Sequence, residues 1–253
     1  GYNKIDIEAA ARAEIPVANA PGLNSGAVAE LVLAAVINLQ RGLARADKNI
    51  KEGRYQKVRE DLLAHGMSEL SGTKWGVIGL GEIGSKVARL GRMFEAQVNY
   101  YSRTRKEKLE KELDLRYIEM NELLADSDVV IICLALAKET DHLIGLEELQ
   151  TMKNGSIIVN VGRGGVIDEK ALADALKSGK PSGAALDTFD IEPLPVDHPL
   201  LTLPENVQEK IFLTPHLGGV TTQALNRMLS FALDNCTRVL KGEQPLAVVN
   251  GVK

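Results

Sequence analysis

The chain has 253 residues, of which 25% are charged and only 4% aromatic, and its formal net charge is −4. This length allows one large domain or two small ones, and the net negative charge gives no reason to expect nucleic acid or an anionic membrane as a partner. The cysteines, Cys133 and Cys236, lack metal-ligand spacing, so we expect neither a metal site nor a disulfide. No signal peptide or membrane-spanning run is visible, which predicts a cytoplasmic protein.

The opening segment, residues 1–24, contains a short helical pattern at 7–13 and one strand candidate at 15–18. These elements bury too little surface to fold alone. Because the chain also begins without methionine, we expect that it starts inside a domain and that the natural protein is longer.

A long helix is predicted to begin at Asn24 or Ser25, either of which can cap it, and to end near Leu43. Its apolar residues cover most of its faces, which predicts burial between two layers. A more exposed helix is expected at 45–53, and residues 54–73 are predicted to form a loop-rich connection.

From Lys74 onward, strand patterns alternate with helical ones. The apolar run at 129–134 is continuous, which indicates a strand buried on both faces and hence a parallel sheet between helices. The expected fold class is therefore α/β, a doubly wound parallel sheet. The predicted strands are 75–78, 98–101, 129–134, 157–160, 183–186, 211–213 and 246–249, and the predicted helices are 83–94, 106–113, 120–125, 146–152, 169–177 (with Asp168 as N-cap) and 221–240.

A glycine motif lies between the first strand and the first helix of this alternation. Gly79, Gly81 and Gly84 have the GxGxxG spacing, in which the glycines permit a tight turn and a close approach of backbone to a pyrophosphate. The free N–H groups of the following helix then hold the anion. An ordinary glycine-rich turn is the alternative, but the strand before and the helix after favour a dinucleotide site of the Rossmann type.

The end of the second strand predicts which dinucleotide is bound. An NAD site usually has an acidic residue there, whereas this chain has Ser102, Arg103 and Thr104. Two hydroxyls and a guanidinium fork suit a 2′-phosphate, so NADP is favoured over NAD. Arg105 and Lys106 are alternatively the start of a solvated helix.

Three residues that could perform chemistry each follow a predicted strand: Arg163, Glu192 and His216. Taken alone, each of them is more simply explained as a surface residue in a loop. Together they suit hydride transfer from a cofactor to a 2-keto acid. A guanidinium anchors the substrate carboxylate and polarises the ketone, and an imidazole donates a proton to the carbonyl oxygen. A neighbouring carboxylate favours the charged imidazole.

These motifs resemble those of the D-isomer-specific 2-hydroxyacid dehydrogenases, whose members carry an Arg, a Glu and a His in this order. The resemblance covers nearly the whole sequence, from 19–24 to 214–216, and the segment 101–106 is similar to the glyoxylate and hydroxypyruvate reductase branch. It implies a small 2-keto acid or 2-hydroxy acid as substrate and a homodimer. A cofactor-sensing binding protein of the same ancestry, similar to the corepressors of this family, is the alternative.

The resemblance also implies a domain division. Residues 25–219 correspond to the dinucleotide-binding domain, and 1–24 with 220–253 correspond to parts of a second, flavodoxin-like substrate domain. The loop at 134–137 reads Leu-Ala-Leu-Ala where the family has Leu-Pro-Leu-Thr. The motifs and the resemblance together predict these cofactor-binding residues: Gly79, Gly81, Glu82, Ile83, Gly84, Ser102, Arg103, Thr104, Leu134, Ala135, Thr140, Val161, Gly162, Arg163, Asp187, His216 and Gly218.

Overall fold

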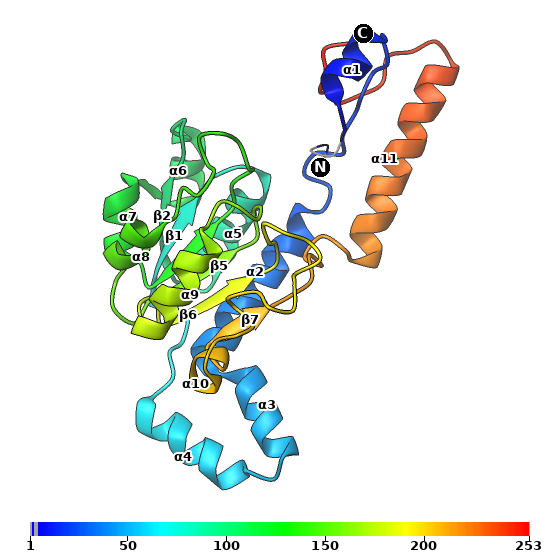
Figure 1. Cartoon of the computed structure of the whole chain (residues 1–253). Coiled ribbons are helices and arrows are strands. Elements are labelled where there is room, and N and C mark those ends of the chain that lie inside the picture. The colour runs from blue at the N-terminus through cyan, green and yellow to red at the C-terminus, as the bar shows by residue number, and fades with distance from the viewer. Residues whose placement is uncertain (1, 3–4, 253) are drawn as a thin grey trace. The chain divides into compact units, whose positions relative to one another are not determined.

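The computed structural model describes residue 2 and residues 5–252, which Figure 1 traces from blue to red. The chain forms two compact units. The larger unit comprises residues 28–218, and the smaller one joins the residues up to Ala27 to those from Gly219 onward. The prediction for residues 1–24 falls partly on residues 1, 3 and 4, which lie outside the described residues.

The larger unit is built around a sheet that contains seven strands within the described part of the chain, all of them parallel. Strand order runs outward in both directions from the pair β1 and β4, which is the switch point of a doubly wound sheet. The predicted α/β fold of the Rossmann type is therefore confirmed. In spatial order the strands are β3 (Arg116–Tyr117), β2 (Gln97–Tyr101), β1 (Lys74–Ile78), β4 (Val129–Ile132), β5 (Ile157–Asn160), β6 (Gly183–Leu186) and β7 (Ile211–Leu213).

Helices cover both faces of this sheet, as Figure 1 shows. Along β4, Val129 and Ile131 enter one buried apolar cluster, whereas Val130 and Ile132 enter the other. This alternation explains why the strand is apolar at every position. On the first face lie α2 (Ser25–Arg41), α5 (Glu82–Met93) and α6 (Glu107–Leu113), and on the second lie α7 (Met120–Asp126), α8 (Leu146–Thr151) and α9 (Glu169–Ser178), with α10 (Glu205–Gln208) before β7.

Two strand predictions need correction. The strand predicted at 129–134 corresponds to β4, which ends at Ile132 because the chain leaves the hydrogen-bonded ladder after Cys133. The edge strand β3 was not predicted, since its two residues are too few to carry an alternating pattern. The short helix α10 was not predicted either. The other predicted strands and helices of this unit have limits within about two residues of those observed, as element limits generally do.

The boundary expected between the long helix and the helix at 45–53 lies at Gly42. This glycine has φ +60°, in the left-handed region, so α2 ends at Arg41 and α3 (Leu43–Lys51) begins after a bend of 62°. Ser25 is the first residue of α2, and its hydroxyl donates to the carbonyl of Gly22 at 2.6 Å.

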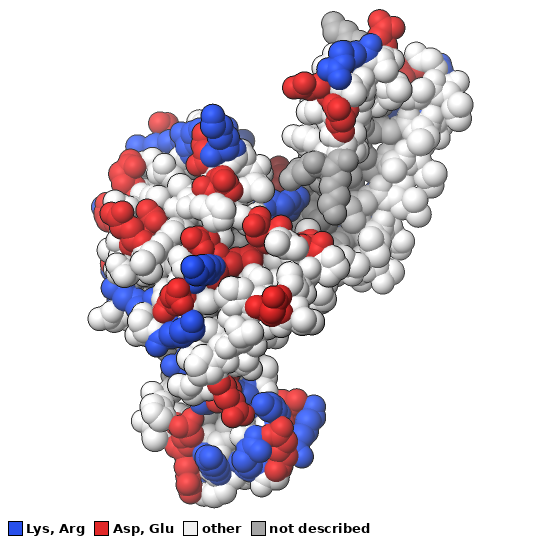
Figure 2. All heavy atoms as spheres, viewed as in Figure 1, with Lys and Arg blue, Asp and Glu red and all other residues white. Residues whose placement is uncertain are grey.

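The predicted loop at 54–73 was also wrong, because it contains the helix α4 (Tyr55–His65). Only Val58 of this helix is buried, so its apolar residues show no clear stripe in the sequence. Figure 2 shows charges of both signs mixed on the visible surface of α3 and α4. Among the described residues no single helix meets the length and hydropathy expected of a membrane span; only α2 and α3 taken together do.

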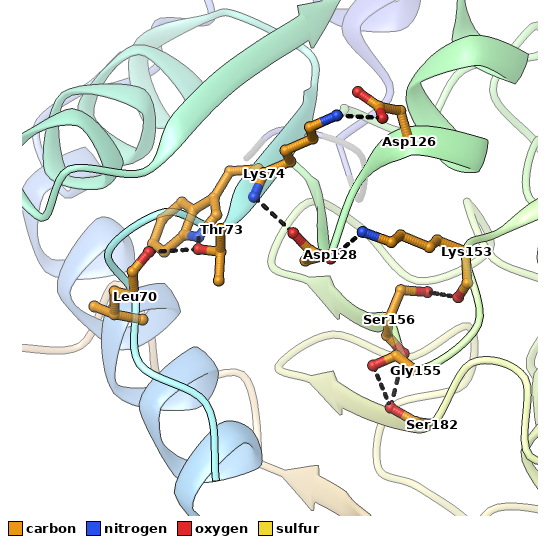
Figure 3. Close-up of polar contacts among 10 residues, drawn as sticks. Leu70, Thr73, Lys74, Asp126, Asp128, Lys153, Gly155, Ser156 and Ser182 are labelled. Carbon is orange, nitrogen blue, oxygen red and sulfur yellow. Dashed lines mark hydrogen bonds and ion pairs between the residues drawn. The ribbon is translucent and has the colours of Figure 1, made fainter.

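Polar contacts connect the residues at the end of the sheet where the strands begin (Figure 3). Asp128 accepts hydrogen bonds from the backbone N–H of Lys74 at 2.8 Å and from Lys153 Nζ at 2.7 Å. The hydroxyl of Ser182 lies 2.9 Å from the carbonyl oxygens of both Gly155 and Ser156. These bonds lie where the strands begin. The loops described below lie at the opposite end of the sheet, where the strands end.

The smaller unit contains α1 (Ile7–Arg12) and α11 (Thr222–Leu240). Thr221 is the N-cap of α11 and accepts a hydrogen bond from the backbone N–H of Ala224 at 3.2 Å. The strands expected at 15–18 and 246–249 are reduced to one antiparallel bridge between Ala18 and Val248, so the two segments do pair.

Candidate active site

The glycine turn between β1 and α5 forms a cradle with open space in front of it. Gly79 has φ +97°, and its N–H donates to the carbonyl of Tyr101 at 2.8 Å. A Cβ at Gly84 would overlap the carbonyl oxygen of Gly79, whereas a Cβ at Gly81 would meet nothing within 4 Å. The backbone of Glu82 and Ile83 then opens α5 without a side-chain cap. This turn fits a pyrophosphate at the N-terminus of α5.

The segments that follow β1, β4 and β5 meet around Leu134. Its side chain lies 2.8 Å from where a Cβ of Gly79 would be, and its carbonyl leaves no room for a Cβ at Gly162, the neighbour of Val161. Beyond Ala135, the hydroxyl of Thr140 donates to the Ala135 carbonyl and accepts from the N–H of Ala137, both at 2.8 Å. Predicted cofactor residues from three loops are thus brought to one place.

The loop after β2 is stabilised by an acidic residue of α6. Arg105 forms two hydrogen bonds of 2.8 Å with the carboxylate of Glu110, which also accepts from the hydroxyl of Tyr100 at 2.6 Å. The bonds from Arg105, followed by that from Tyr100, hold the pKa of Glu110 at about 2. Burial, together with the bond to Glu110, raises the pKa of Tyr100 to about 12. Arg105 and Lys106 directly precede α6, as the alternative of a solvated helix start expected, and Arg105 additionally forms this ion pair.

The three residues expected to select the dinucleotide lie on the same loop. Ser102 is buried, and its hydroxyl donates to the carbonyl of Thr104 at 2.7 Å. The side chain of Arg103 is exposed and has no hydrogen bond or ion pair among the described residues. Figure 2 shows Lys and Arg side chains gathered over the end of the unit that carries α6. The guanidinium of Arg103 is therefore available to an anion.

Arg163 lies in a tight loop after β5, braced by the buried Asn160. The Asn160 side chain accepts from the N–H of Gly162 at 3.0 Å and donates to the carbonyl of Arg163 at 3.1 Å. The Arg163 guanidinium donates to the Gly162 carbonyl at 2.8 Å. Asn160 was not singled out from the sequence, although a polar residue at the end of an apolar strand was a signal for it.

Asp187, directly after β6, organises the loop that follows β7. Its carboxylate accepts from the hydroxyl of Thr214 at 2.6 Å and from the N–H groups of Leu217 and Gly218, each at 2.9 Å. These bonds surround His216, whose φ of 52° is uncommon for a residue other than glycine. A strained backbone conformation persists where neighbouring interactions stabilise it, and here the hydrogen bonds to Asp187 hold the residues on either side of His216. Thr214 was not among the predicted site residues.

Glu192 and His216 are in direct contact. The imidazole Nδ1 of His216 lies 2.9 Å and 3.1 Å from the two oxygens of the Glu192 carboxylate. Glu192 Oε1 also accepts from the backbone N–H of Phe189 at 3.0 Å, which folds the loop after β6 back on itself. Since Nδ1 faces the carboxylate, the other imidazole nitrogen, Nε2, is the one that can serve a substrate.

The Arg163 loop packs against the Glu192 loop through their backbones. A Cβ at Gly164 would overlap the peptide that joins Phe189 to Asp190, so only glycine allows this approach. Because β5, β6 and β7 are adjacent and parallel, the loops that follow them begin at the same end of the sheet. The structure thus brings together the loops of all three predicted catalytic residues and pairs two of the side chains directly.

One hollow of this unit lies at the opposite end of the sheet, where the strands begin. It has a volume of about 460 Å³, and residues at the beginnings of strands line it, among them Ile157 and Gly183, together with His65 and Asp61 of α4. Ligands of open α/β sheets bind beyond the strands' carboxyl ends, so this hollow is not the expected site. Within the described part of the chain no cluster of three or more His, Cys, Asp or Glu could hold a metal.

The sequence of this chain is similar to those of known proteins. The sequence profile of the D-isomer-specific 2-hydroxyacid dehydrogenase NAD-binding domain matches residues 33–218. A glyoxylate reductase of Aeropyrum pernix is 38% identical over 253 residues, which cover 99% of this chain and 74% of that protein. A glyoxylate reductase of Korarchaeum cryptofilum is 36% identical, with 99% and 74% covered.

Solved structures give the same result. A glyoxylate reductase from Paecilomyes thermophila superposes with a TM-score of 0.85 at 33% identity, covering 98% of this chain and 72% of that one. The holo form of D-mandelate dehydrogenase from Rhodotorula graminis superposes with a TM-score of 0.92 at 28% identity, covering 100% and 73%. The fold is therefore shared with these proteins.

Proposed function

This chain belongs to the D-isomer-specific 2-hydroxyacid dehydrogenases, and from that premise we propose that it reduces a small 2-keto acid, such as glyoxylate or hydroxypyruvate, to the D-2-hydroxy acid. The observation that carries the proposal is the contact of His216 Nδ1 with Glu192, next to the loop of Arg163. The similarity to two glyoxylate reductases supports the choice of substrate.

Each of the three residues has a distinct task in this proposal. Arg163 holds the substrate carboxylate and polarises the ketone, because a guanidinium binds a carboxylate bidentately. His216 donates the proton from Nε2 to the carbonyl oxygen, while Glu192 fixes the ring through Nδ1 and favours its charged form. A bound nicotinamide dinucleotide supplies the hydride.

The cofactor residues follow from the cradle. The pyrophosphate is held at the start of α5 by the glycine turn and the first residues of the helix: Gly79, Gly81, Glu82, Ile83 and Gly84. Around the rest of the dinucleotide lie the loops after β4, β5, β6 and β7, which contribute Leu134, Ala135, Thr140, Val161, Gly162, Asp187 and Gly218. The carboxylate of Asp187 accepts three described hydrogen bonds, and a carboxylate has about four acceptor sites, which leaves capacity for the nicotinamide amide.

NADPH is proposed as the preferred reductant over NADH. Glu110 holds Arg105, whereas the side chain of Arg103 is free of partners among the described residues and stands beside Ser102 and Thr104. A 2′-phosphate would give the Arg103 guanidinium an anionic partner, whereas the 2′-hydroxyl of NADH carries no charge.

The smaller unit is proposed to belong to a substrate domain, with the larger unit as the dinucleotide-binding domain. A homodimer is proposed to form through α3 and α4, because Leu43, Ile50, Tyr55, Leu63 and Met67 of this region are exposed apolar residues. Light scattering after size exclusion tests the dimer: a monomeric mass would refute it. The cytoplasmic location stays a prediction, which cell fractionation can check.

The deciding experiment is a panel of 2-keto acids assayed with NADPH and with NADH, following the loss of reduced-cofactor absorbance. The expected result is turnover of glyoxylate or hydroxypyruvate that falls by about 100-fold or more in His216→Asn. Nucleotide binding without turnover of any acid would overturn the proposal and favour the cofactor-sensing binding protein.

A further inference from the structure

A second carboxylate is buried close to the loop of Glu192. Glu169, the first residue of α9, has a side chain only 7% exposed. Its Oε1 accepts a hydrogen bond from the backbone N–H of Asp190 at 2.9 Å, and its Oε2 lies 2.9 Å from His198 Nε2. Both partners belong to the segment that runs from β6 towards α10, which is also the segment that carries Glu192.

The hydrogen bonds around His198 assign its proton. His198 Nδ1 accepts from the backbone N–H of Leu200 at 3.3 Å, so the proton of a neutral ring lies on Nε2 and is donated to Glu169. The His198 side chain is only 11% exposed. Glu169 therefore receives two donors, from residues 190 and 198, and holds both ends of this part of the loop.

Burying a carboxylate is costly unless hydrogen bonds compensate it. Desolvation raises the pKa of Glu169, while the bond from Asp190 and the contact with His198 oppose that rise. Asp168 already caps α9 through its bond from the Ala171 N–H, so the helix does not need Glu169 as its cap. Its partners point instead to a role in the neighbouring loop.

The loop peptide held by Glu169 leads directly to the active-site pair. Phe189, which precedes Asp190, donates its N–H to Glu192 Oε1, and Gly164 of the Arg163 loop packs against the same peptide. The peptide between Phe189 and Asp190 is therefore held in two ways: its N–H donates to Glu169, and Gly164 packs closely against it. Any displacement of it would move the carboxylate that faces His216.

We propose that Glu169 is a positioning residue, which holds the peptide between Phe189 and Asp190 so that Glu192 stays directed at His216. The proposal rests on the proposed function for its catalytic consequence, but its structural part does not depend on turnover. His198 assists by keeping the Glu169 carboxylate in place.

The first test is kinetic. Glu169→Ala should lower kcat by up to about 100-fold, since a displacement near 1 Å in the catalytic geometry can have that effect, while KM for the nucleotide stays at the wild-type value. Glu169→Gln retains an oxygen for the Asp190 N–H but turns its NH₂ group towards His198 Nε2–H, so it should recover only part of kcat. Should Glu169→Ala not fold, Glu169→Asp replaces it, because it keeps the charge but is one carbon too short to reach.

Asp168→Ala is the matched control. It removes the cap of the same helix and should lower the unfolding temperature without lowering kcat. Equal losses of kcat in Asp168→Ala and Glu169→Ala would mean that Glu169 acts only through the stability of α9 and would overturn the proposal.

Amide hydrogen exchange gives a readout that needs no turnover. In Glu169→Ala the N–H of Phe189 should exchange faster than in the wild type, because its acceptor, Glu192, is displaced. The N–H groups of Leu217 and Gly218, which donate to Asp187, should exchange at wild-type rates. Unchanged exchange at Phe189 would refute the positioning role, whereas an inactive wild type with this exchange pattern would refute only the proposed function.

Discussion

The imidazole of His216 and the carboxylate of Glu192 meet at 2.9 Å, although 24 residues separate them and they follow different strands. The contact selects Nδ1 as the nitrogen that faces the protein and leaves Nε2 for chemistry. His216 reaches this position with φ 52°, a conformation maintained by the bonds from Leu217 and Gly218 to Asp187.

Removing either member of this pair should impair reduction to different degrees. His216→Asn loses the proton donor and should lower kcat by about 10² to 10⁴. Glu192→Gln keeps an oxygen for the Phe189 N–H but loses the charge beside the imidazole, so a smaller loss is expected. Steady-state kinetics with a fixed keto acid measure both. A wild-type kcat in His216→Asn would show that the proton comes from elsewhere.

Substitutions at two of the three glycines of the turn should have different effects. Gly81→Ala places its methyl group in open space, so the protein should fold normally but bind the dinucleotide more weakly. Gly84→Ala forces a methyl group into the carbonyl of Gly79 and should lower the unfolding temperature. Calorimetry and nucleotide titration separate these outcomes. Unchanged nucleotide affinity in Gly81→Ala would place the pyrophosphate outside this cradle.

Arg103 and Arg105 should differ although they are near neighbours. Arg103→Ala removes the proposed partner of the 2′-phosphate, and KM for NADPH should rise about 10- to 100-fold, with little change for NADH. Arg105→Ala instead breaks the ion pair with Glu110 and should reduce stability more than selectivity. Equal effects of Arg103→Ala on both nucleotides would refute the NADP assignment.

The Glu110 carboxylate predicts a pH dependence. Its pKa in the folded protein is lowered to about 2, mainly by Arg105, so its stabilising effect is complete above the unfolded-state pKa. The effect is lost as the pH falls from about 4.5 towards about 2. Urea unfolding of the wild type and Glu110→Gln should therefore differ more at neutral pH than in strong acid. The same difference at both would contradict this reasoning.

Local patterns in the sequence were sufficient for every strand of the sheet except β3 and for the glycine turn. The strands β5, β6 and β7 are short apolar runs, and burial on both faces of a parallel sheet requires such runs. The left-handed turn at Gly79 needs glycine, so it is visible as a motif. The long apolar helix and the more exposed helix after it were likewise predicted as two elements, and Gly42 lies at their boundary in the structure.

The amino-acid sequence by itself determined the order of strands and helices and placed Arg163, Glu192 and His216 at strand ends, because apolar periodicity and glycine spacing are local properties. Only the tertiary structure decided which side chains meet. The His216 and Glu192 contact, the Asp187 brace and the Glu169 bond to Asp190 each join residues more than 20 positions apart. Such pairs depend on the adjacency of β5, β6 and β7 and on the path of each loop, which no local pattern encodes.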